Sequence, residues 1–434
     1  MKFKIPLVGD ILEGHVVALL LTYCENFMRL IYGIVFLLIA RKLLSPEDFS
    51  SFVFCYSLAI ILYGFSKFSL DAFSIREIIH RPIMARGLVW RLVVFRFLFS
   101  SIFFLFFVLF LYIVDKIYGV FLWLIFLQAL RSLDSVEWYL RAEGHVIFQA
   151  ISRMVSMSIV LSLLLYVYNS GYEVESWNVV LIQSLEWMIL ALMYFFWMIH
   201  QEYQSGVSGG NDLFSLVVVK SMPAYLGYVF FIIYSKIDQI LLEGFLGHVE
   251  YGNYMIAARV NESAVILIGS LNMVLFPKLV RAYNESKDSF CKYVRSVSLF
   301  FFFLSLLVVF CVWGVRFFYG FLPAMIKDLL PYDTVIYLSY MVFSIIPMFL
   351  FGLRSSYFSI TGSTVEILKG GGFGLCAALF LGVPSVFLWG AYGGIFCFFI
   401  SCLSALFISN FFSSPGRVFT RLVFYPMKPS GTGL

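Results

Sequence analysis

The stretch SKIDQILLEGFLGHVEYGNYMIAARVNESAVILIGSLNMVLFPK, residues 235–278, decides the fold of this chain. Two apolar segments flank the polar turn GHVEYG at residues 247–252, and Asp238, Arg259 and Glu262 lie inside or beside them. Long apolar segments are typical of membrane-spanning helices. An ionisable group within such a helix costs about 2.5–3.5 kcal/mol on insertion scales, so it normally faces a bundle interior or a water-filled cavity.

A weaker copy of the same turn occurs near the start of the chain. Residues 43–52, LLSPEDFSSF, align with residues 245–254, FLGHVEYGNY, which lie 202 positions later. Apolar, acidic, aromatic and small positions coincide, and the acidic match pairs Asp48 with Glu250. The pattern indicates two related halves, which we place at residues 1–205 and 206–434.

The composition sets the class of protein. The 434 residues are 62% hydrophobic and only 13% charged. A soluble protein of this length could not bury so much apolar surface, so spans of about 20 residues are expected. About twelve apolar windows can be drawn, of which the last two are separated only by Trp389-Gly390. The predicted fold is an all-α integral membrane protein with two six-helix lobes, related by a pseudo-twofold axis along the membrane normal.

The positive residues predict the orientation. Most of the 30 Lys and Arg residues fall in loops on the side of the two termini, whereas a few, including Lys236, fall in loops on the opposite side. Because cytoplasmic loops carry the positive excess, both termini are expected in the cytoplasm. The first residues read as a cytosolic leader into the first span, without a convincing cleavage site.

Several function classes lack their signatures. The seven Cys are scattered, without a CxxC pair or a His/Cys cluster, so neither a disulfide framework nor a metal site is indicated. The sequence has no GxGxxG or Walker pattern and no soluble domain. We therefore expect no enzyme activity, no cofactor and no nucleic-acid partner.

Ionisable residues at membrane depth are the candidate functional groups. They are Glu25, Arg29, Arg96, Arg153 and Glu186 in the first half and Lys220, Arg259 and Glu262 in the second. Cations outnumber anions in this set. A cavity lined by these residues should therefore attract an anionic ligand, such as a pyrophosphate or an acidic sugar.

Some of these residues have an equally good structural explanation. Glu25 and Arg29 are four residues apart, and Arg259 and Glu262 are three apart. Each pair could therefore neutralise itself on one helix face. Arg153 lies near the cytoplasmic end of its span, where we expect it to reach lipid phosphates.

The remaining charges differ in their surroundings. Arg96 and Lys220 have no obvious partner on their own helices, so they are better candidates for ligand binding. Glu186 is alone in its span and is expected to pair with Arg153 across the bundle or to carry a proton. The charged residues after the fourth span, including Glu137, are interpreted as a solvated cytoplasmic face.

Four stretches resemble the Wzx-type O-antigen and polysaccharide flippases, within the multidrug/oligosaccharidyl-lipid/polysaccharide exporter superfamily. The stretches are IARKLLSPEDF at 39–49, FSLDAFSIRE at 68–77, EWYLRAEG at 137–144, and the combination of KIDQILL at 236–242, GNY at 252–254, AARV at 257–260 and FP at 276–277. The last combination is the most specific. Ser50, Ser69 and Glu243 stand where that family usually has Gly, and beyond about residue 294 only the hydropathy matches.

The resemblance implies a flippase that moves an undecaprenyl-pyrophosphate-linked oligosaccharide from the inner to the outer leaflet of the bacterial inner membrane by alternating access. On this reading, the substrate is held by Arg29, Arg96, Lys220 and Arg259. Coupling to protons or sodium would fall to Glu25, Glu186, Asp238 or Glu262. The partners would be the lipid-linked substrate, membrane lipids, an O-antigen polymerase and a chain-length regulator.

Two other classes stay open at this point. A membrane glycosyltransferase or O-antigen polymerase usually carries its site on a sizeable outer loop, which this sequence lacks, and its halves would not be expected to repeat. A multidrug cation antiporter of the same superfamily needs an acidic lumen, whereas the candidate residues here are net basic.

Overall fold

The computed structural model describes residues 8–67, 74–75, 77–78, 82–113, 122–171, 174–202 and 211–424. Within these ranges the chain is helical and contains no β-strand. Its contacts divide it into two compact units. The first unit comprises Met1–Leu43 with Leu70–Lys220, and the second comprises Leu44–Ser69 with Ser221–Leu434.

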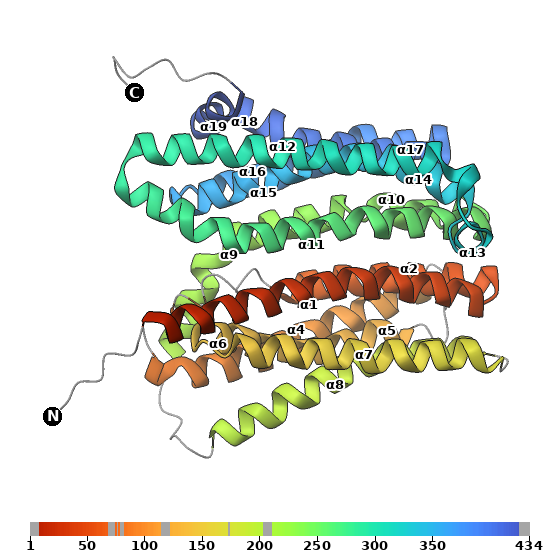
Figure 1. The fold of residues 1–434 in the computed structure, drawn as a ribbon, viewed down its shortest axis with the longest axis horizontal. Helices are drawn as coiled ribbons and strands as arrows, with labels where there is room; N and C mark the ends of the chain where they lie inside the picture. Colours follow the sequence, from red (N-terminus) through yellow and green to blue (C-terminus); the bar gives the residue numbers. More distant parts are fainter. Residues whose placement is uncertain are drawn as a thin grey trace. The chain divides into compact units, whose positions relative to one another are not determined.

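The first unit is built on long apolar helices (Figure 1). In chain order they are α1 (Val8–Leu43), α4 (Pro82–Ile113), α5 (Leu122–Leu127), the 3-10 helix η2 (Gln128–Ser135), α6 (Val136–Ala142), α7 (Val146–Ser170) and α8 (Ser176–Glu202). Helix α7 packs along both α1 and α8, while α4 packs against η2. These contacts bring the polar faces of α1, α6, α7 and α8 together inside the unit.

The fourth predicted span is not a regular helix, because the eight residues of η2 interrupt it. A 3-10 helix has three residues per turn, so side chains three positions apart lie on one face. Arg131 Nε accordingly lies 3.6 Å from a carboxylate oxygen of Asp134, and the Ser135 hydroxyl donates to the Ser132 carbonyl at 2.9 Å. Asp134 and Ser135 are buried, so this span presents a polar face to the protein interior.

Helix α9 (Asn211–Tyr234) connects the two units along the chain, and the second unit contains the remaining helices. They are α2 (Pro46–Lys67), α10 (Ile237–Leu242), α11 (His248–Glu285), α12 (Lys287–Phe317), η3 (Tyr319–Phe321), α13 (Ala324–Leu329), α14 (Tyr332–Met341), η4 (Val342–Ser344), α15 (Ile345–Ile360), α16 (Val365–Ala377), η5 (Ala378–Gly382), α17 (Val383–Leu403), η6 (Ser404–Ile408), α18 (Ser409–Phe411) and α19 (Ser414–Phe424). Helix α11 is the central element, because it packs against α2, α12, α14 and α15.

The start points of α2 and α11 agree with the sequence repeat. Helix α2 begins at Pro46 and α11 begins at His248, which preserves the offset of 202 residues. Ser45 caps α2, since its hydroxyl accepts from the Asp48 amide at 3.1 Å and donates to the Asp48 carboxylate at 3.0 Å. Gly247 takes the corresponding position before α11. Most of the polar turn in the sequence is therefore the first part of a helix.

Helices α2 and α11 run side by side. A Cβ built on Gly252 would lie 3.0 Å from the Phe49 ring, and Arg259 donates to the Ser57 hydroxyl at 3.1 Å. The sequence offset between partners is nearly the same in both contacts, so the helices are parallel and repeat-equivalent positions meet. By its contacts α2 belongs to the second unit. The division of the lobes between residues 205 and 206 stays a prediction.

The number of spans agrees with the sequence. In the described ranges, nine helices are long and apolar enough to cross a membrane. The longest, Val365–Phe411, is broken at Gly390, whose φ of 55° and ψ of −127° suit only glycine. The Ser385 hydroxyl donates to the Gly393 carbonyl at 2.9 Å across this break, so the segment is a tight pair of spans, as predicted. Helix α11 and the α5–η2–α6 segment cover the two other expected windows.

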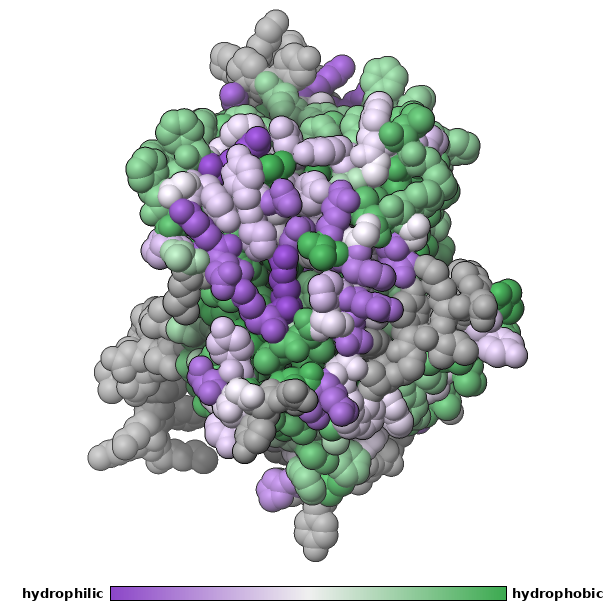
Figure 2. Space-filling model, turned by 90° about the vertical axis from the view of Figure 1, so that its right-hand side faces the viewer, coloured by the Kyte–Doolittle hydropathy of each residue, from purple (hydrophilic) through white to green (hydrophobic). Residues whose placement is uncertain are grey.

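The surface has the polarity of a membrane protein. Large apolar side chains on long helices are widely exposed, including Phe106 at 69%, Phe310 at 72% and Phe380 at 77%. Figure 2 shows the end of the molecule where α13 lies, and hydrophilic side chains gather on this face while apolar residues cover its flanks. This distribution is expected where an apolar belt contacts lipid and the helix ends contact water.

Candidate functional site

The candidate residues fall into two buried polar clusters, one in each unit. Glu25, Arg29, Arg96 and Glu186 lie in the first unit, and Asp238, Arg259 and Glu262 lie in the second. Lys220 belongs to α9, but its side chain lies outside the described residues.

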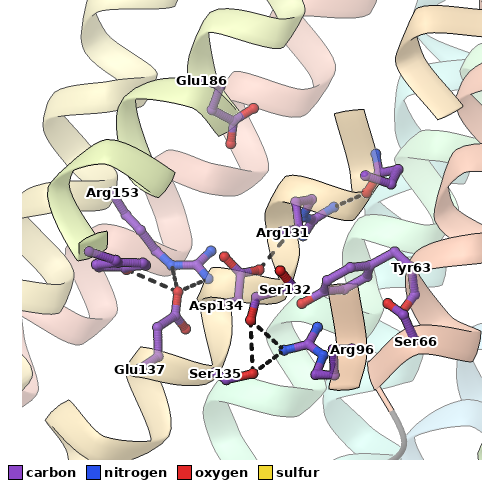
Figure 3. A network of polar contacts seen from close by, with 12 residues as sticks. Tyr63, Ser66, Arg96, Arg131, Ser132, Asp134, Ser135, Glu137, Arg153 and Glu186 are labelled. Carbon is purple, nitrogen blue, oxygen red and sulfur yellow. Dashed lines mark hydrogen bonds and ion pairs between the residues drawn. The ribbon is translucent and has the colours of Figure 1, made fainter. Parts of the chain in front are cut away.

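The first cluster centres on Glu137 of α6 (Figure 3). Its carboxylate accepts hydrogen bonds from two guanidinium nitrogens of Arg153, of which Nε is 2.8 Å away. It also accepts from the Tyr194 hydroxyl at 3.0 Å, from Gln149 Nε2 at 3.1 Å and from Arg141 at 3.4 Å. Burial of a carboxylate is costly unless it is paired and hydrogen bonded. This carboxylate therefore ties α6, α7 and α8 together.

Two expectations about this cluster were wrong. Arg153 does not reach toward lipid, because its side chain is only 10% exposed and pairs with Glu137. Glu137 is itself buried rather than solvated. The physical reason is η2, whose tighter winding precedes α6 and changes the face that α6 presents, whereas the sequence pattern had assumed a regular helix end.

Glu25 of α1 joins the same cluster. Its Oε1 pairs with Arg29 one turn along the helix, as the spacing predicted, and Arg153 Nε lies 3.6 Å from the same oxygen. Glu25 thus lies between two guanidinium groups. Arg29 also keeps one buried donor, Nε, that has no hydrogen-bond partner among the described residues.

Arg96 of α4 is held inside the first unit. Its side chain is fully buried, and Nη1 donates to the Ser135 hydroxyl at 2.8 Å (Figure 3). The guanidinium group also lies over the Trp138 ring, 5.2 Å from the centroid. Sequence reasoning found no partner on its own helix, and the partners indeed come from η2 and α6.

Glu186 of α8 lines a cavity of about 10 Å³ together with Arg131, Asp134 and Arg153. This volume corresponds to roughly one water molecule. Gln183 Nε2 donates to the Glu186 carboxylate at 3.1 Å. Arg153 forms ion pairs with Glu137 and Glu25 instead of the expected one with Glu186.

The second cluster centres on Glu262 of α11. Its carboxylate accepts from Lys236 Nζ, from Gln239 Nε2 at 2.6 Å and from Arg259 Nη1 at 2.9 Å. Arg259 also donates to Ser57 of α2, and its guanidinium group lies 4.7 Å from the centroid of the Tyr56 ring. As in the first cluster, one buried guanidinium donor, Arg259 Nε, lacks a hydrogen-bond partner in the part of the chain described.

Sequence reasoning missed Lys236, which it placed in an outer loop. The seventh span is broken at Ser235 and Lys236, between α9 and α10, where the Lys236 amide donates to the Ile233 carbonyl at 3.1 Å. The break turns the Lys236 side chain inward, where it is only 3% exposed. The available signal was the polar sequence KIDQ, in which three polar residues interrupt an apolar window.

Asp238 lies beside this cluster with an incomplete set of partners. The Tyr254 hydroxyl donates to one carboxylate oxygen. The other oxygen, Oδ1, and Asn261 Oδ1 are both buried without a hydrogen-bond partner among the described residues. Asp238 and Asn261 line a cavity of about 10 Å³ with Ser235. The space is large enough for one water molecule.

Comparison with known proteins gives similarity at the level of structure alone. No protein-family model and no curated protein matches the sequence. An inward-facing multidrug resistance MATE family transporter of the MOP superfamily superposes with a TM-score of 0.70 at 16% identity, over 92% of this chain and 95% of that chain. The lipid II flippase MurJ in an inward closed conformation gives 0.63 at 12% identity, over 94% and 90%. A eukaryotic MATE transporter gives 0.61 at 12% identity, over 93% and 96%.

The chain has the fold of these transporters. The predicted fold class is thereby confirmed: an all-α membrane protein of about twelve spans in two lobes. Sequence identities this low show a shared architecture but not a shared substrate. The function must therefore be argued from the two clusters.

Proposed function

We propose that this protein is a flippase that moves an undecaprenyl-pyrophosphate-linked oligosaccharide from the inner to the outer leaflet of the bacterial inner membrane, with both termini in the cytoplasm. The observation that carries the proposal is the buried Nε donor on each of Arg29 and Arg259, which has no hydrogen-bond partner within the described ranges. A buried guanidinium donor without an acceptor is costly, and a phosphate oxygen is a suitable acceptor for it. Arg96 and Lys220 are proposed to add positive charge along the path of the substrate.

The carboxylates suggest how transport is driven. Glu25 is paired with Arg29, and Glu262 is paired with Arg259. Each carboxylate therefore competes with an anionic substrate for the same guanidinium group. Protonation of the carboxylate would release the arginine for the substrate, so proton binding and substrate binding favour one another. Glu186 and Asp238 are proposed as further proton or cation sites, because each lines a water-sized cavity.

Multidrug export is the second candidate, because a multidrug resistance MATE transporter gives the higher TM-score, 0.70 against 0.63 for the lipid II flippase. A drug cation would have to approach clusters in which Arg29, Arg153, Lys236 and Arg259 are gathered. Like charges repel, so we rank this candidate below the flippase.

Reconstitution in proteoliposomes tests the proposal. A fluorescent undecaprenyl-pyrophosphate-linked sugar is placed in both leaflets, and its flipping is followed by the loss of protection from a membrane-impermeant quencher. We expect the wild-type protein to accelerate flipping. A proton gradient that is acidic inside the proteoliposomes should change the flipping rate. Wild-type protein that leaves the rate unchanged, yet drives the efflux of cationic dyes, would establish the drug exporter instead.

A further inference from the structure

A cavity of about 300 Å³ lies among α9, α11, α15 and α16 of the second unit. Its wall is aromatic. Tyr228 and Phe231 of α9 stack at 6.4 Å between centroids with 21° between planes, and Phe231 stacks on Phe351 of α15 at 6.3 Å and 11°. The volume lies at the lower end of the range for small-molecule sites, and aromatic walls are common in such sites.

Tight backbone packing surrounds this open space. A Cβ on Gly227 would lie 2.9 Å from the Ile367 carbonyl oxygen, and a Cβ on Gly352 would lie 2.7 Å from Ile268. The helices thus approach as closely as glycine allows on either side of the cavity. The cavity is partly open and its lining is mostly apolar, so an apolar ligand can enter it and fit its walls.

A cation contacts one of the rings that line this cavity. Lys67, in the last turn of α2, has its ammonium group 6.0 Å from the centroid of the Tyr228 ring. The end of α2 packs firmly against α9 here, because a Cβ on Gly64 would overlap the Ile232 side chain. An aromatic cavity with a cation against one of its rings suits an amphiphile that has an anionic head and an apolar chain.

We infer that this cavity holds the part of an isoprenoid chain next to its phosphate, with the phosphate directed toward Lys67. This inference rests on the proposed function, since it names the place where the lipid tail of that substrate is held. The flat, unsaturated units of an isoprenoid chain can stack on the parallel rings of Phe231 and Phe351, which a saturated acyl chain cannot do. The occupant is therefore the isoprenoid and not a bulk phospholipid.

Photolabelling tests the inference directly. Purified protein in phosphatidylcholine nanodiscs is labelled with a benzophenone analogue of farnesyl diphosphate, and the labelled peptides are mapped. Ala224 lines the cavity, so Ala224→Phe fills it, whereas Leu226→Phe alters an exposed position on the same helix that does not line it. We expect Ala224→Phe and Lys67→Gln to lower labelling by about tenfold, and Leu226→Phe and Lys67→Arg to retain it.

The controls separate the inference from the function on which it rests. Competition by phosphatidylglycerol equal to that by unlabelled farnesyl diphosphate would show a general anionic lipid site and overturn the inference. Unchanged labelling of Ala224→Phe would overturn it as well. If the wild-type protein flips the lipid-linked sugar but no label is found in α9 or α15, the cavity inference is wrong and the proposed function stands. Labelling in the cavity by a protein that flips nothing would support the binding site and refute the proposed function.

Discussion

Arg259 donates a hydrogen bond to Ser57 at 3.1 Å across a separation of 202 residues, which is the offset of the internal repeat. Two equivalent positions of a parallel repeat can touch only where the local symmetry axis passes between them. The axis relating α2 to α11 therefore runs beside this hydrogen bond. The unmatched Arg259 Nε lies at the same place, so the cation proposed to bind substrate is close to the axis of the repeat.

Replacing Arg259 tests its role in transport. We expect Arg259→Ala to slow the flipping of the lipid-linked sugar by about tenfold to a hundredfold, because a charge-assisted hydrogen bond to phosphate is lost. Arg281→Ala is the matched control, since Arg281 is exposed on the same helix. Quencher protection in proteoliposomes measures both rates. Equal rates for the two variants would remove Arg259 from the proposed substrate path.

Replacing Glu262 tests the competition between carboxylate and substrate. Glu262→Gln mimics the protonated acid and releases Arg259 from its ion pair. We expect tighter binding of a soluble pyrophosphate analogue and flipping that no longer responds to a proton gradient. Isothermal titration and proteoliposome assays at two pH values measure these effects. Weaker binding than in the wild-type protein would contradict the competition.

The Glu137 cluster is expected to act on stability. Glu137→Gln leaves the buried Arg153 without its main counter-ion, and breaking a buried ion pair costs about 3–5 kcal/mol. The variant should therefore lose thermal stability in detergent, as measured by a shift in Tm. Exposed Glu143→Gln, on the adjoining turn, is the control. An additional Arg153→Met change should restore part of the loss, and a double variant less stable than Glu137→Gln would refute this explanation.

The hairpin at Gly390 makes a further prediction about stability. A side chain at φ 55° and ψ −127° is strained, so Gly390→Ala should cost about 1–3 kcal/mol. Gly372 has helical geometry and open space at its Cβ, with the nearest atom at 4.0 Å. Gly372→Ala should therefore be neutral or slightly stabilising. A thermal melt of both variants decides the matter, and equal melting temperatures would argue against the strained turn.

The orientation can be tested with topology reporters. A reporter inserted at Glu175, between α7 and α8, should read as external, and one at Ser286, between α11 and α12, should read as cytoplasmic. The reason is the positive excess on the side of the termini. Paired fusions active on opposite sides of the membrane measure this outcome. The reverse signals at both positions would invert the proposed direction of transport.

Hydropathy and the spacing of residues along the chain predicted most of the architecture. The span pattern, the break at Gly390 and the pairing of Glu25 with Arg29 follow from neighbours along the chain. The buried clusters depend on irregular backbone that a periodic pattern does not contain. The 3-10 segment η2 turned Glu137 inward, and the break before α10 did the same for Lys236. The partners of Glu137 and Lys236 come from other helices, so a sequence pattern along one helix cannot predict them.

The contact between Ser57 and Arg259 also limits how such a chain can have arisen. If two identical copies had assembled as a dimer, the same side chain would have met itself across the axis at this position. Two guanidinium groups at that distance would repel each other strongly in a low-dielectric interior. Joining the copies into one polypeptide lets the two positions mutate independently. A cation can then stand on one side of the axis with a hydroxyl on the other, an arrangement that two identical chains in a dimer cannot have.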